Sequence, residues 1–196
     1  MNFENVPERQ PSFAPFIAKN LSEEEREIFL QKILSLEQKI FPPDWQYEDA
    51  EMYYREMLES PSAINIFLRG DNNEVAGYLL AKPLSEVYEE LAQDDPALKN
   101  DEYCYYIETT EILPKYAKGR GSFKFLSALQ KEIEENHLEY TTISAHARVS
   151  NGLADVLVRR VKKNLIEERS IERWAHGGGE PYKYIQWAIE KQEDTL

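Results

Sequence analysis

Apolar side chains in the first half of the chain recur at helical spacing. In residues 22–40 they share one helical face, which consists of Phe29, Ile33, Leu36 and Ile40. Ser22 and Glu25 match a capping box at the start of this helix, and Pro42-Pro43 predicts its end. A second helix is predicted over about 48–59, where the side chains available for packing are Met52, Tyr53, Met57 and Leu58.

The rest of the pattern alternates strands with helices. Strands are predicted at 63–69, 74–82, 105–112, 140–147, 165–174 and 182–189, and helices at 122–136 and 151–163. A short acidic helix over 85–91 would be an extra element before the central strand. This order predicts an α/β (α+β) fold in which a mixed sheet carries helices on both faces. Gly77, inside the second strand, indicates a bulge or the close approach of another backbone.

The stretch 108–130 predicts a strand, a tight loop and a helix. Pro114 ends the strand because it cannot donate to a sheet ladder, and Gly119 and Gly121 bracket Arg120 in the loop. The free N–H groups at the start of a helix bind phosphates, and glycines allow a close backbone approach. An ordinary strand-to-helix turn is the alternative. Lys124 stands where the dinucleotide-binding fingerprint needs its third glycine, and no Walker pattern is present.

Two motifs in this region resemble a known family. Ile112-Leu-Pro-Lys-Tyr-Ala-Lys-Gly-Arg-Gly121 is similar to the acyl-CoA loop of the GCN5-related N-acetyltransferase (GNAT) family, Val-x-Pro-x-Tyr followed by Arg/Gln-x-x-Gly-x-Gly/Ala. Further along, Ala147-Arg-Val-Ser-Asn-Gly-Leu-Ala154 resembles the family's Val-Arg-x-Ser-Asn-x-x-Ala. The resemblance covers 20–190. It implies a GNAT-like, mostly antiparallel sheet with a splayed central pair of parallel strands, and acetyl-CoA as co-substrate.

The length of 196 residues predicts a single domain. We expect that domain over 21–190, with an N-terminal arm over 1–20, an insertion at about 84–101 and a C-terminal tail over 191–196. Hydrophobic residues at 42% and charged residues at 30% are typical of a soluble globular protein. No apolar run approaches the roughly 20 residues of a membrane span.

Charge and cysteine usage narrow the partners and the compartment. The net charge of −13 argues against nucleic acid as a partner. It suits a cationic acceptor such as an amine, although a generic acidic surface is the simpler alternative. Cys104 is the only cysteine, which together with the absence of a secretory signal favours a cytoplasmic protein. The final hairpin and the insertion offer surfaces for a homodimer.

The resemblance implies where the cofactor would bind. The pantetheine arm would enter a gap between residues 111–113 and 145–147, and an N–H near Ile112 would stabilise the oxyanion. Pyrophosphate would meet the loop over 117–122. The implied cofactor-binding residues are Ile112, Leu113, Ala117, Lys118, Gly119, Arg120, Gly121, Ser122 and Asn151. A plain helix cap is the alternative role for Asn151.

The sequence departs from the family pattern at two points. Tyr116 or Ala117, depending on the alignment of the loop, replaces the usual Arg or Gln before the first glycine. Val158 replaces the tyrosine that usually protonates the leaving thiolate, and Lys163-Asn-Leu replaces the usual Gly-Phe. Valine donates no proton, so the acid must come from elsewhere or catalysis is lost.

Two residues are candidates for catalysis. Glu108 lies four residues before Ile112, where many family members carry an acidic residue that faces the acceptor. Strand alternation would place Glu108, Thr110 and Ile112 on one face and Glu111 on the other, unless a bulge intervenes. His146 is the second candidate base because its ordinary pKa is near neutral. A solvated carboxylate and a core histidine are the respective alternatives. His137 and His176 show no metal-ligand spacing, so no metal is expected.

The sequence therefore predicts an N-acetyltransferase that transfers acetyl from acetyl-CoA to a primary amine by direct attack in a ternary complex. The acceptor would be a small-molecule or peptide amine. The alternative is a catalytically degenerate GNAT-like module that binds CoA or a protein, and a weaker one is a protein for another phosphate ligand. A tyrosine near the thioester, such as Tyr106, would favour the enzyme. An acceptor groove filled by residues 84–101 would favour the binding module.

Overall fold

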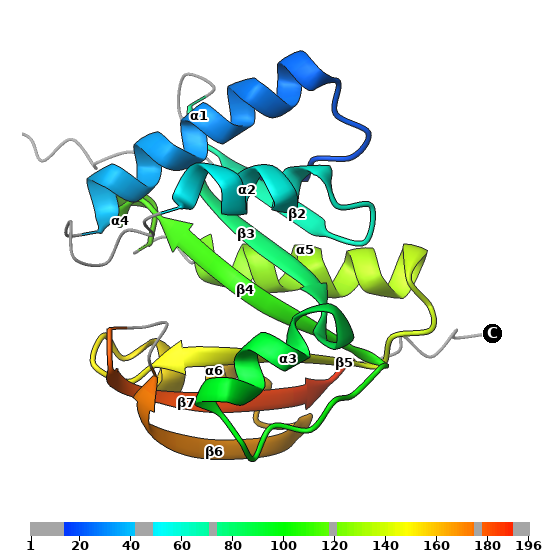
Figure 1. Cartoon of the computed structure of the whole chain (residues 1–196), viewed down its shortest axis with the longest axis vertical. Coiled ribbons are helices and arrows are strands. Elements are labelled where there is room, and N and C mark those ends of the chain that lie inside the picture. Colours follow the sequence, from blue (N-terminus) through cyan, green and yellow to red (C-terminus); the bar gives the residue numbers. More distant parts are fainter. Residues whose placement is uncertain (1–13, 42–48, 71–73, 118–120, 175–177, 190–196) are drawn as a thin grey trace, which may run out of the picture.

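The computed structural model describes residues 14–41, 49–70, 74–117, 121–174 and 178–189. Its elements, in chain order, are β1 (Ala14–Ile17), α1 (Glu23–Ile40), α2 (Ala50–Glu59), β2 (Ile64–Arg69), β3 (Val75–Pro83), α3 (Leu84–Asp94), β4 (Cys104–Ile112), α4 (Pro114–Ala117), α5 (Gly121–Asn136), β5 (Thr142–Arg148), α6 (Leu153–Val161), β6 (Leu165–Trp174) and β7 (Glu180–Ala188) (Figure 1). Two of them, β1 and α4, are not predicted from the sequence.

A seven-stranded sheet forms the centre of the molecule, in the order β1-β2-β3-β4-β5-β7-β6. Every neighbouring pair is antiparallel except β4 and β5, which run parallel. Helices α1, α2 and α3 pack on one face, and α5 and α6 on the other (Figure 1). The expected mixed, mostly antiparallel sheet with helices on both faces is confirmed.

The first two helices form the layer above β2 and β3. The predicted capping box at Ser22 and Glu25 is present, and Leu30, Ile33 and Leu36 are buried. In α2 the expected packing is wrong at one position. Met52 is 59% exposed, whereas Tyr54 is fully buried and its hydroxyl lies 3.1 Å from that of Tyr78.

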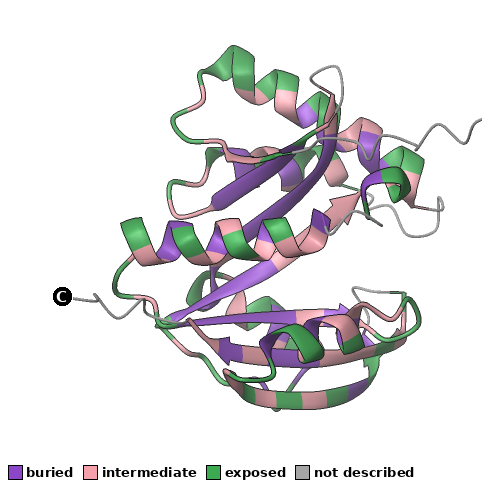
Figure 2. Cartoon of the chain, turned by 180° about the vertical axis from the view of Figure 1, so that it is seen from behind, coloured by how far each residue is buried: buried purple, intermediate pink, exposed green. Residues whose placement is uncertain are grey.

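The opposite face carries the larger core. Helix α5 buries Phe125, Leu129 and Ile133 against the strands, while Phe123 and Leu126 are only half-buried. In Figure 2 the central strands are buried along most of their length, whereas the edge strand β6 alternates between exposed and covered positions. The larger core therefore lies between the central strands and helices α5 and α6.

The central parallel pair opens part of the way along its length. Strands β4 and β5 pair from Cys104 and Thr142 as far as Ile107 and Ala145, and then diverge (Figure 1). Beyond that point β4 pairs only with β3, and β5 only with β7. The predicted splay is thus present. It begins earlier along β4 than predicted, and Ala145, which was expected in the gap, is still paired with Ile107.

A bulge at Glu108 marks the start of the divergence. Leu80 faces Thr109 across the β3–β4 ladder, but the next residue of β3, Ala81, faces Ile107, so Glu108 is the extra residue. Such a bulge reverses the alternation that follows it. Glu111 faces Tyr78, a residue of the α1–α2 core, so it shares the face of Glu108 rather than the opposite one. The alternation expected from simple strand geometry is therefore wrong here.

Candidate active site

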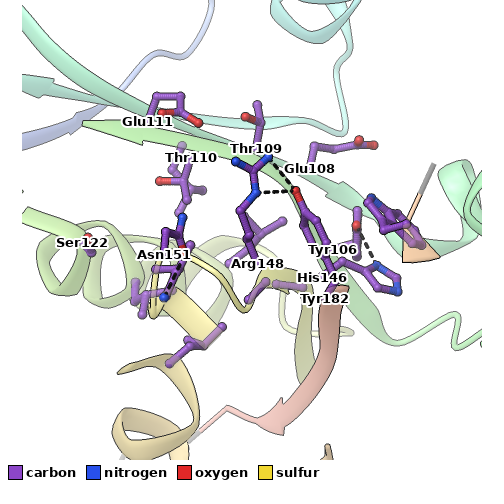
Figure 3. Close-up of a pocket in the computed structure, with 18 of the residues that line it drawn as sticks. Tyr106, Glu108, Thr109, Thr110, Glu111, Ser122, His146, Arg148, Asn151 and Tyr182 are labelled. Carbon is purple, nitrogen blue, oxygen red and sulfur yellow. Dashed lines mark hydrogen bonds between the residues drawn. The ribbon is translucent and has the colours of Figure 1, made fainter. Parts of the chain in front are cut away.

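The diverging strands enclose a cavity of about 420 Å³. Its walls come from β4 from Tyr106 onwards, from β5 from Ala145 onwards, from the end of α1 and from the starts of α5 and α6. Single residues of β3, β6 and β7 complete them, namely Leu79, Trp174 and Tyr182. Figure 3 shows the polar side chains that point into it, among them Glu108, Glu111, Arg148 and Asn151. None of residues 84–101, all of which the structure describes, lines this cavity. The insertion therefore does not fill it.

The structure places the predicted cofactor residues unevenly around this cavity. Ser122, in the first turn of α5, and Asn151, just before α6, line it directly. Gly121 is buried at the start of α5, and Ala117 is exposed at the end of α4. Leu113 lines a different pocket, beside α1. Lys118, Gly119 and Arg120 lie outside the described residues.

Ile112 connects the strand to the start of α5. A Cβ added to Gly121 would lie 3.1 Å from Cδ1 of Ile112, so the two residues are in close contact. The N–H of Leu113 donates to the carbonyl of Ala76 at 2.9 Å. Because successive N–H groups of a strand point to opposite edges, the N–H of Ile112 is directed towards the gap. The side chain of Ile112 packs against the core, and the residue does not line the cavity itself.

Asn151 takes a local structural role as well as a place in the cavity wall. Its Oδ1 accepts a hydrogen bond from the N–H of Leu153, the first residue of α6, at 2.9 Å. The N-cap itself is Gly152, which adopts a positive φ of 74°. Asn151 therefore stabilises the first turn of α6 from the position before the N-cap. The Asn151 side chain as a whole still borders the cavity (Figure 3).

His146 is buried and linked to Tyr106 across the closed end of the gap. The hydroxyl of Tyr106 lies 2.9 Å from Nδ1 of His146 (Figure 3), and both residues line the cavity. The imidazole stacks on the indole of Trp174 at a centroid distance of 4.0 Å. Burial lowers the pKa of His146, and a hydrogen bond to Asp95 offsets part of that effect. The histidine is therefore held in its neutral form near pH 7.

Glu108 faces the helical layer above the sheet. Its Oε2 accepts a hydrogen bond from the hydroxyl of Tyr53, on α2, at 3.3 Å. Both the bulge and this contact direct the carboxylate to the α2 side of the cavity. Glu108 and His146, predicted separately, thus line the same cavity, where Tyr106 joins them.

Glu111 and Arg148 are polar groups of the cavity that were not singled out from the sequence. Burial raises the pKa of Glu111 to about 8, with Arg148 acting to lower it and Glu37 to raise it. Arg148 donates two hydrogen bonds to the hydroxyl of Tyr182, at 3.1 and 3.0 Å (Figure 3). One carboxyl of this site thus changes charge near neutral pH.

The two departures from the family pattern have plain structural consequences. Val158 is half-buried against the α5 core, so no proton donor stands there. Tyr116 is fully buried, and its hydroxyl donates to Glu74 at 2.6 Å, which anchors α4 to the start of β3.

Burial raises the pKa of the Cys104 thiol to about 11, which suits a core residue rather than a nucleophile.

Neither a candidate metal site nor a membrane-spanning helix is found in the described part of the chain. No group of three or more His, Cys, Asp or Glu side chains there is arranged to hold a metal ion. None of the helices that the structure describes is long and apolar enough to cross a membrane.

The most informative residue that sequence reasoning missed is Asp95, which contacts His146 from the insertion. Nothing in the sequence connects these two positions, which are 51 residues apart. For Glu111, the resemblance implies a place beside the gap, but the face on which its side chain lies depends on the bulge at Glu108, which the residue pattern does not locate.

Comparison with known proteins identifies the fold. No protein-family model matches the sequence, and neither does any curated protein. Among solved structures, the loading GNATL domain of CurA from Lyngbya majuscula is similar with a TM-score of 0.63, 13% identity, and coverage of 92% of this chain and 100% of that one. A ribosomal-protein-alanine N-acetyltransferase from Escherichia coli has a TM-score of 0.58, 16% identity, and coverage of 93% and 98%.

Arabidopsis thaliana NAA60 in complex with acetyl-CoA is similar with a TM-score of 0.57, 15% identity, and coverage of 90% of this chain and 97% of that one. At these identities the likeness concerns the fold. It agrees with the seven-stranded sheet, the parallel β4–β5 pair and the two sequence motifs. The expected resemblance is thereby confirmed, and this chain has the GNAT fold.

Proposed function

We propose that the protein is an acetyl-CoA-dependent N-acetyltransferase. The observation that carries this proposal is the opening of the β4–β5 pair after Ile107 and Ala145, with a cavity between the two strands. Strand edges that pair with no other strand need hydrogen-bond partners. An extended pantetheine arm supplies amide groups that match them.

The residues around the cavity fit acetyl-CoA. The pantetheine arm would lie between β4 and β5, with the N–H of Ile112 facing the thioester carbonyl. Ser122 lies in the first turn of α5, where free N–H groups and the helix dipole favour the pyrophosphate. The structure of NAA60 from Arabidopsis thaliana contains acetyl-CoA, which supports the same co-substrate here.

The acceptor would be a primary amine that enters from the α2 side. Glu108 and Tyr53 meet there, and a carboxylate complements the positive charge of an ammonium group. The similar E. coli protein is an alanine N-acetyltransferase of a ribosomal protein, which supports a peptide amine within the expected acceptor class.

For the chemical step we assign the base to His146 acting through Tyr106. The acceptor attacks as the neutral amine, after its ammonium proton has passed to solvent. Tyr106 accepts a second proton from the attacking nitrogen as its own proton passes to Nδ1 of His146, and the C–N bond forms at the thioester carbonyl. When the C–S bond breaks, Tyr106 returns a proton to the departing thiolate and regains one from the imidazolium. Tyr106 and His146 together thus supply both the base and the acid. A tyrosine at position 158, where this chain has valine, is then not needed.

Calorimetric titration with acetyl-CoA tests the cofactor site. Gly121 is a poor position for a test variant, because an added Cβ would lie 3.2 Å from the carbonyl of Tyr116 and 3.1 Å from Ile112. Ser122→Glu instead places an anion at the cavity wall. Ser127→Glu is its matched control, since Ser127 is exposed on the same helix and does not line the cavity. We expect wild type and Ser127→Glu to bind acetyl-CoA and Ser122→Glu to bind it weakly or not at all.

A panel of amines, with release of the CoA thiol as readout, then tests transfer. Turnover with any amine supports the enzyme. If the protein binds acetyl-CoA but turns over neither small amines nor peptide N-termini, the result favours the second candidate, a CoA-binding module without catalysis. That candidate is suggested by Val158, which replaces the usual proton-donating tyrosine. No binding by the wild type would overturn the proposal.

A further inference from the structure

The insertion before β4 ends on a carboxylate that contacts His146. Asp95 follows α3 directly, and its backbone is fixed by hydrogen bonds between its N–H and Leu91 and between its carbonyl and Leu98, both at 2.9 Å. Its Oδ2 lies 3.1 Å from Nε2 of His146. The side chains are 3% and 1% exposed, so solvent does not compete for this contact.

Both oxygens of Asp95 are occupied by donors. Oδ1 accepts from the guanidinium of Arg169, on β6. Although burial alone would raise it, the pKa of Asp95 is lowered by the hydrogen bonds from His146 and Arg169. The group is therefore a carboxylate, which can only accept hydrogen bonds.

This arrangement determines which nitrogen of His146 carries the proton. Because Asp95 only accepts, Nε2 of the neutral imidazole must be the protonated nitrogen. Nδ1 is then an acceptor, so the hydroxyl of Tyr106 donates to it. Tyr106 thus donates to His146 and His146 donates to Asp95, which also accepts from Arg169, so every hydrogen bond in this series is directed towards the carboxylate.

We propose that Asp95 is a positioning residue of the site, supplied by the insertion, which holds His146 as the Nε2–H tautomer and so makes Tyr106 a proton relay. The proposal rests on the proposed function for the role of Tyr106 in transfer. When Nδ1 receives the Tyr106 proton, the carboxylate of Asp95 stabilises the resulting imidazolium. The insertion is then a working part of the site rather than a decoration of the loop.

Asp95→Asn gives the sharpest variant, because Arg169 has only donors and must face the amide oxygen of the new residue. The amide NH₂ would then face Nε2 of His146 and force the proton onto Nδ1. The hydroxyl of Tyr106 would then accept a hydrogen bond from Nδ1–H of His146 instead of donating one. The substitution causes this reversal without changing the volume of the side chain at position 95. Asp94→Asn, at the last residue of α3, is the matched control next to it.

Long-range ¹H–¹⁵N spectra of the imidazoles read the tautomer directly, with His146→Gln to assign the signal among the three histidines. We expect Nε2–H in the wild type and in Asp94→Asn, and Nδ1–H in Asp95→Asn. An Nδ1–H tautomer in the wild type overturns the inference without any test variant. It is equally overturned if Asp95→Asn is folded and keeps Nε2–H.

Kinetics and calorimetry on the same proteins separate this inference from the proposed function. Asp95→Asn should bind acetyl-CoA as the wild type does but lose roughly 10²-fold or more in kcat, the order seen when a general base is mispositioned. An equal kcat in the wild type and in Asp95→Asn would refute the role of Asp95, while the proposal that the protein is an acetyltransferase would stand. Failure of the wild type to bind acetyl-CoA would refute the proposed function, whichever tautomer is found.

Discussion

Ile107 and Ala145 are the last paired residues of the parallel ladder between β4 and β5. From this point the two strands diverge, and a cavity of about 420 Å³ lies between them. The bulge at Glu108 coincides with the start of the divergence. The extra residue of β4 thus lies where the β4–β5 pairing ends, and it places Glu108 and Glu111 on the same face.

Tyr106→Phe and His146→Gln should each lower kcat by roughly 10²–10⁴-fold, because either change interrupts proton transfer. The Kd for acetyl-CoA should not change. The double variant should lose no more than the worse single variant, since the two residues act as one unit. Tyr103→Phe, at an exposed tyrosine, is the control. Additive losses measured by steady-state kinetics would contradict a shared relay.

Glu108→Gln should act on the acceptor rather than on acetyl-CoA. Loss of the carboxylate on the α2 side should raise the KM for the amine by about tenfold, equivalent to ~1.4 kcal/mol. Tyr53→Phe should act in the same direction but less, because Tyr53 only orients Glu108 through a 3.3 Å hydrogen bond. A loss confined to kcat would instead identify Glu108 as the base.

Glu111 should make the folded protein less stable as pH rises. Its pKa is raised from 4.5 to about 8 in the folded state, so between these values the folded chain keeps a proton that the unfolded chain releases. The free energy of unfolding of Glu111→Gln relative to wild type should therefore increase between pH 5 and pH 9, by on the order of a few kcal/mol.

Urea denaturation at both pH values measures this difference. Glu89→Gln, at an exposed glutamate of α3, is the control and should follow the wild type. If the stability of Glu111→Gln also follows the wild type at both pH values, Glu111 is ionised in the folded protein and the account of its environment is wrong.

Gly77→Ala should destabilise the sheet where β3 supports the open part of β4. A Cβ at this position would lie 2.4 Å from the carbonyl oxygen of Glu111, which is too close for any side chain. The expected cost is about 1–3 kcal/mol, as for other overpacked sites, with weaker acetyl-CoA binding as Glu111 and Ile112 shift. An unchanged melting temperature and Kd would show that this contact has no such role.

The sequence predicts most of the architecture because the spacing of apolar residues shows which face of each helix or strand is buried. The helix from Glu23 to Ile40 and the strands on either side of the central loop follow from such patterns. β1 does not, since four residues at a sheet edge leave little periodic signal. The close backbone approach predicted at Gly77 is confirmed by its contact with Glu111.

The candidate site is only partly readable in the sequence, because its geometry depends on pairings between distant segments. The motif resemblance implies Ser122 and Asn151 as cofactor residues, and the near-neutral pKa of an ordinary histidine indicates His146 as a candidate base. All three line one cavity. The link between Asp95 and His146 depends on how the insertion folds back over β5, which no local pattern encodes. The orientation of Glu111 depends on one extra residue in a ladder, which shifts every side chain after it.

Amide hydrogen exchange with and without acetyl-CoA tests the central claim most directly. If the pantetheine arm pairs with the open strands, peptides covering residues 108–112 and 146–148 should exchange more slowly when acetyl-CoA is bound. Peptides from β6, at the far edge of the sheet, should not change. Protection confined to other segments, with these two exchanging as in the free protein, would contradict the placement of the cofactor and the function built on it.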